Sequence, residues 1–214
     1  MAAKPKRRTR ERILETALAM FNGYGEPAVT TAAIALEMGI SPGNLYYHYK
    51  SKEKIVEDLV TGFRHEIDPI LAAPEKRLPN AEDCWLFLHL VFEAIWKYRF
   101  IYRDLNELIT RYRSVETHFR RILAHEIRVA EEIMSGLVAG GQMKASPSEI
   151  AALAQSMAMV ATYWLSFEYA KNPRAEQDGR ALARGAFQVM SLAAPYLGAH
   201  ERKLFDHLAE KYIS

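Results

Sequence analysis

The chain has 214 residues, which is enough for one small and one medium-sized domain. Half of the residues are hydrophobic and a quarter are charged, and 28 basic against 26 acidic residues leave a net charge of +2, so the composition is that of a globular protein and excludes a disordered or fibrous one. The single cysteine, Cys84, excludes an intrachain disulfide, and the N-terminus lacks the apolar core of a signal peptide, so we expect a cytoplasmic protein.

Basic charge is concentrated at the N-terminus. Residues 1–12 contain six basic residues and one acidic residue, a net charge of +5, and the rest of the chain carries −3. A charge distribution of this kind suits a polyanionic partner such as nucleic acid. We expect residues 1–8 to form a disordered basic arm, for which a solubility tail or a nuclear-targeting patch is the alternative.

Three helices are predicted in the first 50 residues. The first spans about 9–23, where apolar residues recur at helical spacing. Two short helices follow at about 30–37 and 42–48, and Gly39 lies where the chain must turn between them, because glycine accepts a positive φ. Helix–turn–helix corners of this kind bind DNA in some proteins and only pack a core in others.

The helix at 42–48 has too little apolar surface to build a core. Ser41 can cap it, Pro42 suits its first position, and Leu45 is its single apolar anchor among polar and aromatic side chains. A short polar helix after a tight turn can enter the major groove of DNA. We therefore interpret the corner as a DNA-binding element.

The same segment carries a specific resemblance. The runs Arg10–Phe21 and Gly39–Glu53, with Gly23-Tyr24-Gly25, Thr30-Thr31 and Ile34-Ala35 between them, resemble the tetracycline-repressor (TetR) family of bacterial regulators. The resemblance covers about residues 8–60. It implies a helix-turn-helix DNA-binding domain over 9–50, a connecting helix over 51–71, and a variable ligand-binding and dimerisation domain over 80–214.

The resemblance and side-chain chemistry together predict the DNA contacts. Helix N-termini and hydroxyl groups can bind DNA phosphates. Asn44 can pair with a base edge, and Gly43 permits close approach of the helix backbone to DNA. For Tyr47 and His48 an ordinary packing role is the alternative, and Tyr46 or Tyr49 is expected to pack inward. The predicted contacts are Thr30, Thr31, Ser41, Pro42, Gly43, Asn44, Tyr47, His48 and Lys52.

The rest of the chain is also predicted to be helical, giving an all-α protein of about nine or ten helices. The prolines near 72–80 mark the best domain boundary, and Ser146 with Glu149 is a strong helix start. The further predicted helices begin with one at 52–71 and one capped by Asn80, and continue over 101–112, 115–139, 148–171, 178–196 and 200–213.

The last long helices offer a dimer surface. Along 148–171 and 178–196, small residues allow close helix approach and large apolar residues supply burial. Two such helices from each chain could form a four-helix interface, or they could pack only within one chain. The uncharged run 150–167 approaches the length of a membrane span, but its polar interruptions favour a buried interface helix. The predicted interface residues are Leu153, Met157, Ala161, Trp164, Leu182, Ala186, Phe187 and Met190.

The middle of the chain is rich in aromatic residues, which at helical spacing are first of all core. The resemblance implies a cavity there for a largely apolar or aromatic ligand with a polar handle. Its predicted wall is Trp85, Leu88, Phe92, Trp96, Met134, Met157 and Tyr163.

The sequence thus predicts a homodimeric repressor that binds a pseudo-palindromic operator in double-stranded DNA and is released by a small molecule. The alternative is a nonspecific DNA-binding or helical interaction protein without effector control. No catalytic residue, cofactor or metal site is predicted, since the pairs His89/Glu93 and His118/His125 lack the density of a metal site.

Overall fold

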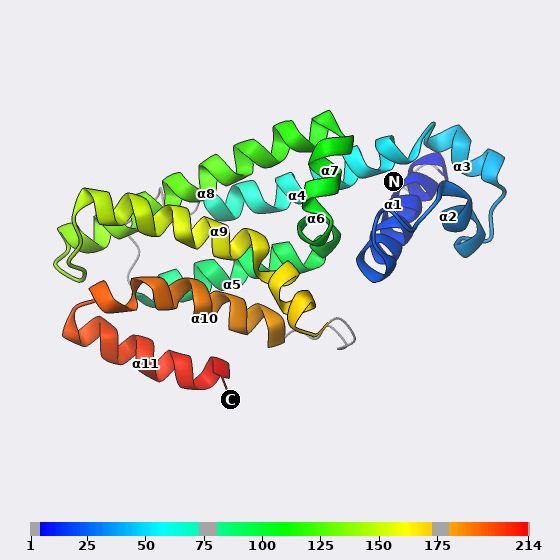
Figure 1. Ribbon diagram of the computed structural model, residues 1–214. Helices are drawn as coiled ribbons and strands as arrows, with labels where there is room; N and C mark the ends of the chain where they lie inside the picture. Colours follow the sequence, from blue (N-terminus) through cyan, green and yellow to red (C-terminus); the bar gives the residue numbers. More distant parts are fainter. Residues whose placement is uncertain (1–4, 73–80, 173–179, 214) are drawn as a thin grey trace. The chain divides into compact units, whose positions relative to one another are not determined.

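A computed structural model describes residues 5–72, 81–172 and 180–213, and within these ranges the chain is all-α, with eleven α-helices, one short 3-10 helix and no strand. This confirms the predicted fold class. In chain order the elements are α1 (Pro5–Tyr24), α2 (Thr31–Glu37), α3 (Pro42–His48), α4 (Lys52–Leu71), α5 (Ala81–Lys97), α6 (Arg99–Arg103), α7 (Leu105–Arg111), α8 (Arg113–Ala139), α9 (Pro147–Lys171), α10 (Arg180–Ala193), η2 (Ala194–Tyr196) and α11 (Ala199–Ile213) (Figure 1).

Two boundaries differ from the prediction. Helix α1 begins at Pro5, so the described part of the expected disordered arm, residues 5–8, is helical. Proline suits a first turn, and the basic residues after it are good helix formers. The predicted helix at 101–112 is two helices, α6 and α7, broken at Asp104, whose φ of −103° and ψ of 17° leave the helical region. The Asp104 carboxylate accepts a hydrogen bond from the Glu26 N–H at 2.8 Å, in keeping with the tendency of Asp to leave helices for local bonding.

The chain forms two compact units. Unit 1 contains residues 1–65 and 98–119, and unit 2 contains residues 66–97 and 120–214. The division falls inside α4, between α5 and α6, and inside α8. Most of the predicted boundary at 72–80 lies outside the described residues. Contacts group residues 98–119 with the N-terminal helices instead of with the C-terminal part of the chain.

The core of unit 1 joins the N-terminal helices to α6 and α8. Phe21 of α1 packs against Phe100 of α6 with ring centroids 5.3 Å apart, and both side chains are fully buried. Phe63 of α4 packs against Tyr98 and Tyr102 at 5.5 and 5.8 Å. Burial of these rings accounts for the association of distant parts of the sequence in one unit.

In unit 2, α10 packs against both α9 and α5 (Figure 1). Gly185 allows the close approach, because a Cβ at this position would lie 2.4 Å from Phe92 Cε1 and 2.7 Å from Trp164 Cδ1. The Trp164 indole N–H also donates to the Ala181 carbonyl at 2.7 Å. Helix α9 is long and apolar enough to cross a bilayer, but half of its most apolar window is buried inside the protein.

Candidate DNA interface

The α2–α3 corner is held by the caps that the sequence predicts. Thr30 Oγ1 accepts from the Ala33 N–H at 3.1 Å, and Ser41 Oγ accepts from the Asn44 N–H at 3.2 Å. Gly39 adopts a φ of +65° between the two helices, a conformation that L side chains rarely adopt. These local bonds set the start of both helices and the turn that joins them.

Helix α3 is anchored on one side only. Leu45 is its buried residue, at 1% exposure, whereas Tyr46 and Tyr47 are 57% and 61% exposed. The Tyr47 ring lies edge-on to the His48 ring at 5.3 Å, and Lys50 Nζ lies 4.7 Å above the Tyr46 ring. The helix therefore presents polar and aromatic side chains outward, as a recognition helix must.

The predicted DNA contacts are mostly accessible. Thr31, His48 and Lys52 are half-buried. The remaining six residues are exposed on or beside α2 and α3, and they are Thr30, Ser41, Pro42, Gly43, Asn44 and Tyr47. Their contact with DNA stays a prediction.

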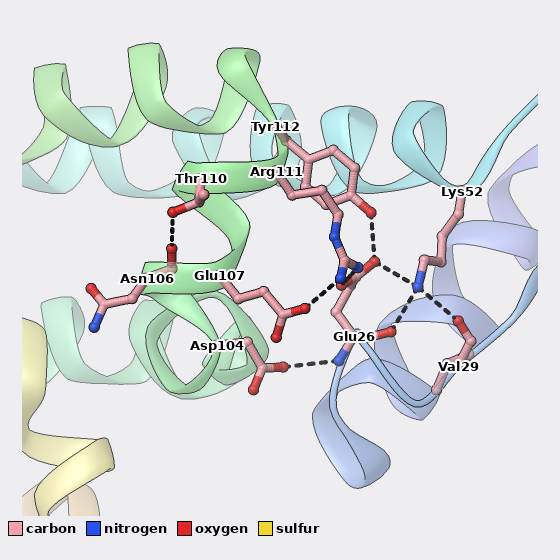
Figure 2. Close-up of polar contacts among 9 residues, drawn as sticks. All are labelled: Glu26, Val29, Lys52, Asp104, Asn106, Glu107, Thr110, Arg111 and Tyr112. Carbon is pink, nitrogen blue, oxygen red and sulfur yellow. Dashed lines mark hydrogen bonds and ion pairs between the residues drawn. The ribbon is translucent and has the colours of Figure 1, made fainter.

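Lys52 is engaged inside the protein. Its ammonium group forms an ion pair with Glu26 Oε1 at 2.8 Å and donates to the carbonyl oxygens of Glu26 and Val29 at 3.0 Å each (Figure 2). An ammonium group has three N–H donors, so these contacts use its full hydrogen-bonding capacity. In this arrangement Lys52 holds the loop between α1 and α2 and does not extend toward a phosphate.

The centre of this arrangement is Glu26, for which the sequence predicts no role. Its side chain is fully buried, and its carboxylate also accepts from Tyr112 Oη at 2.7 Å and pairs with Arg111 Nη1 at 3.2 Å (Figure 2). Burial, together with the hydrogen bond to Glu26, raises the pKa of Tyr112 to about 12, so the phenol stays a donor at neutral pH. The loop before α2 is thereby fixed to the α7–α8 junction within unit 1.

A second polar cluster fixes the other end of the corner. Tyr49 is 2% exposed, and its hydroxyl donates to Asp58 Oδ2 at 2.7 Å. Arg10 donates to the same oxygen at 2.7 Å and to Tyr49 Oη at 3.1 Å. Of the two tyrosines expected to pack inward, it is Tyr49 that does so, and Arg10 of the basic N-terminus ties α1 to the start of α4.

Unit 2 contains a cavity of about 90 Å³ between α5, α8, α9, α10 and α11. Four of the predicted ligand-binding residues line it, namely Trp85, Leu88, Met134 and Met157. The other three lie away from its wall: Phe92 is buried against Gly185, Trp96 is half-buried, and Tyr163 is 44% exposed.

Most of the predicted dimer residues pack against other residues of the same chain. Leu182 and Phe187 are half-buried, and Met157 lines the cavity. The other five are buried by the packing of unit 2 itself, and they are Leu153, Ala161, Trp164, Ala186 and Met190. Four large apolar side chains of α9 stay exposed: Met159, Tyr163 and Phe167, which recur every four residues, and Tyr169.

In the parts of the chain that the structure covers, no three His, Cys, Asp or Glu residues are grouped to hold a metal ion. His89 and Glu93 do share a helix face, with Nε2 and Oε1 3.3 Å apart, and both side chains are substantially exposed.

An all-α chain with a capped helix-turn-helix and an outward-facing second helix has the architecture of the helix-turn-helix class of DNA-binding proteins. Two family models match it: "Bacterial regulatory proteins, tetR family" over residues 13–59 and "Bacterial transcriptional repressor" over residues 62–205. The chain belongs to the TetR family of bacterial transcriptional regulators, which confirms the resemblance seen in the sequence.

Individual relatives agree with this assignment. A TetR-family transcriptional regulator from Marinobacter aquaeolei superimposes with a TM-score of 0.86 at 32% identity, covering 95% of this chain and 98% of that one. The nucleoid occlusion factor SlmA of Shewanella loihica is 30% identical over 137 residues, 58% of this chain and 70% of the relative. The transcriptional repressor KstR2 of Mycobacterium tuberculosis is 46% identical over 54 residues, 25% of this chain and 27% of the relative.

Proposed function

We propose that the protein is a homodimeric, cytoplasmic transcriptional repressor that binds a pseudo-palindromic operator and is released by a small, largely apolar ligand. The observation that carries the DNA-binding half is the exposure of α3, which Leu45 alone anchors while Tyr46 and Tyr47 face solvent. Repression by occlusion of a promoter needs no further surface, so it is the simplest outcome of such binding.

Dimerisation would place two recognition helices on one DNA face. One helix reads only a few base pairs, and two half-sites lie one turn apart, roughly 34–36 Å. Met159, Tyr163 and Phe167 supply exposed apolar surface on α9 that a second copy could bury. A pseudo-palindromic operator follows from the two-fold symmetry of such a dimer.

Release by a ligand would be a population shift. A molecule in the cavity of unit 2 that binds better to a state with wrongly spaced recognition helices lowers DNA affinity by its differential affinity for that state. Residues 52–65 of α4 belong to unit 1 and residues 66–71 to unit 2, so this helix is the proposed connection.

A chromosomal footprint of the purified protein tests this function. We expect protection of one or a few intergenic pseudo-palindromes, and stronger binding to that duplex than to a scrambled duplex of equal length. Equal binding to both would favour a nonspecific DNA-binding protein. Protection spread over many chromosomal sites away from promoters would favour the second candidate, nucleoid occlusion, which rests on the similarity to SlmA.

Tyr47→Ala is expected to weaken operator binding by roughly tenfold, about 1.4 kcal/mol, because it removes an exposed ring from the recognition helix. Titration of a labelled operator measures the change. The melting temperature is expected to stay the same, since the ring is 61% exposed. Tyr24→Ala is the control, because Tyr24 is 73% exposed and lies outside α3. Equal losses in both variants would contradict the assigned role.

A further inference from the structure

The wall of the unit 2 cavity includes a carboxyl group with one buried oxygen. Glu126 of α8 lines it, and its Oε1 atom is buried with no hydrogen-bond partner among the described residues. Burial of an unpaired polar group costs free energy, so a carboxyl group at this position is unfavourable for packing alone. The cavity is several times larger than the roughly 10–15 Å³ that one water molecule needs, and a ligand group has room to reach this oxygen.

The other lining residues show what kind of group that would be. Among the described residues of the wall, Glu126 and Glu201 are the only charged ones, and Lys, Arg and His are absent. Hydroxyl and amide side chains are absent from the described wall as well. The rings of Trp85 and Phe205, 5.9 Å apart, supply aromatic surface that can accept a cation on its face. Acidic groups on an otherwise apolar and aromatic wall select a cation with an apolar body.

We propose that the cavity binds a small lipophilic amine whose protonated nitrogen pairs with the Glu126 carboxylate. This inference rests on the proposed function in taking the cavity as the ligand site, and it names the ligand class. A neutral alcohol or ketone of the same shape would satisfy one hydrogen bond of Glu126, but it would gain no charge attraction in a region of low dielectric. A protonated amine forms the hydrogen bond and also gains the charge attraction.

The proton balance of binding follows from the charge state of Glu126. Burial raises the pKa of Glu126 to about 8, so the empty site is mostly neutral at pH 7. An amine that enters as the cation would favour the carboxylate, and the proton of Glu126 would go to the buffer. The other titratable groups of the described wall are the Cys84 thiol of α5, whose pKa burial raises to about 12, and Glu201 of α11. The wall residues from α9 and α10 carry none.

Calorimetry on the full-length protein without DNA tests the proposal. The probes are n-butylamine, n-hexylamine and 2-phenylethylamine, each paired with the alcohol of the same carbon skeleton. We expect at least one amine to bind tenfold or more tightly than its alcohol, with proton release at pH 7 seen as a dependence of the heat on the buffer. Failure of every amine to bind, or equal binding of amine and alcohol, would overturn the proposal.

Variants of two glutamates on α8 locate the effect. Glu126→Gln is expected to reduce amine affinity at least tenfold, to abolish proton release and to leave alcohol binding unchanged. Glu132→Gln, an exposed position on the same helix, is expected to behave as the unmodified protein. Unchanged amine binding in Glu126→Gln would refute the pairing. The calorimetric assay contains no DNA, so it tests the ligand class alone. If an amine binds but does not release the operator in a separate titration, effector control is rejected and the ligand class stands.

Discussion

Glu26→Ala is expected to lower the free energy of unfolding by about 3–5 kcal/mol, the usual cost of removing one partner of a buried ion pair. The substitution leaves the Lys52 ammonium, whose side chain is 22% exposed, without its carboxylate, and it removes the acceptor of the buried Tyr112 hydroxyl. Chemical denaturation followed by circular dichroism measures the loss.

Glu107→Ala is the matched control, because Glu107 pairs with the same Arg111 from the exposed side of α7. Exposed ion pairs contribute about 0–1 kcal/mol, so a small change is expected. A loss in Glu26→Ala no larger than in Glu107→Ala would show that the buried network contributes little to stability. We also expect Glu26→Ala to weaken operator binding, because the loop that it fixes leads into α2.

Glu126→Gln is expected to stabilise the ligand-free protein increasingly as the pH rises. Burial raises the pKa of Glu126 from 4.5 to about 8, so between these values the folded protein holds a proton that the unfolded chain has lost. The unmodified protein therefore loses stability from about pH 4.5 to about pH 8, by roughly 3–5 kcal/mol in total. The amide cannot ionise, so the variant lacks this slope.

Melting temperatures of the two proteins from pH 4.5 to pH 9 check this expectation. The gap should be smallest near pH 4.5, widen through neutrality and level off above pH 8. Glu132→Gln, on the exposed side of α8, should follow the unmodified protein throughout. A gap that does not vary with pH would mean that the Glu126 carboxyl group reaches solvent in the folded state.

The recognition corner could be predicted because its determinants are local. Ser41 caps α3 through the N–H of Asn44, three residues away, and Ser146 forms the capping box with Glu149 at the same spacing. Bonds of this length are fixed by adjacent sequence. The resemblance to the TetR family rests on the same stretch, so it specifies residues of the DNA-binding half and only the general type of the other half.

Glu26 could not be predicted, because its partners are remote. Lys52 lies 26 residues along the chain, Arg111 lies 85 residues away and Tyr112 lies 86 residues away. A lone glutamate between Gly25 and Pro27 gives no local signal of burial, and an exposed loop is the natural expectation for it. For the same reason the sequence alone predicts a phosphate contact for Lys52.

The spacing of apolar residues likewise does not show which of them line the cavity, fill the core or lie on the surface of unit 2. Helix α9 is apolar around most of its circumference, so the sequence does not reveal that Trp164 faces inward while Tyr163 faces outward. The position of Phe92 depends on its contact with Gly185, about 90 residues along the chain. Packing decides which apolar residues leave a void, and packing is not local.

The internal pairing of Lys52 and Arg10 bears on how ionic strength should affect operator binding. Each lysine or arginine that neutralises a phosphate releases counterions and contributes roughly 0.9 to the slope of log affinity against log salt. Lys52 is neutralised by Glu26 and Arg10 by Asp58. A count of basic residues near the corner that includes both would therefore overstate that slope by roughly 1.8 per protomer.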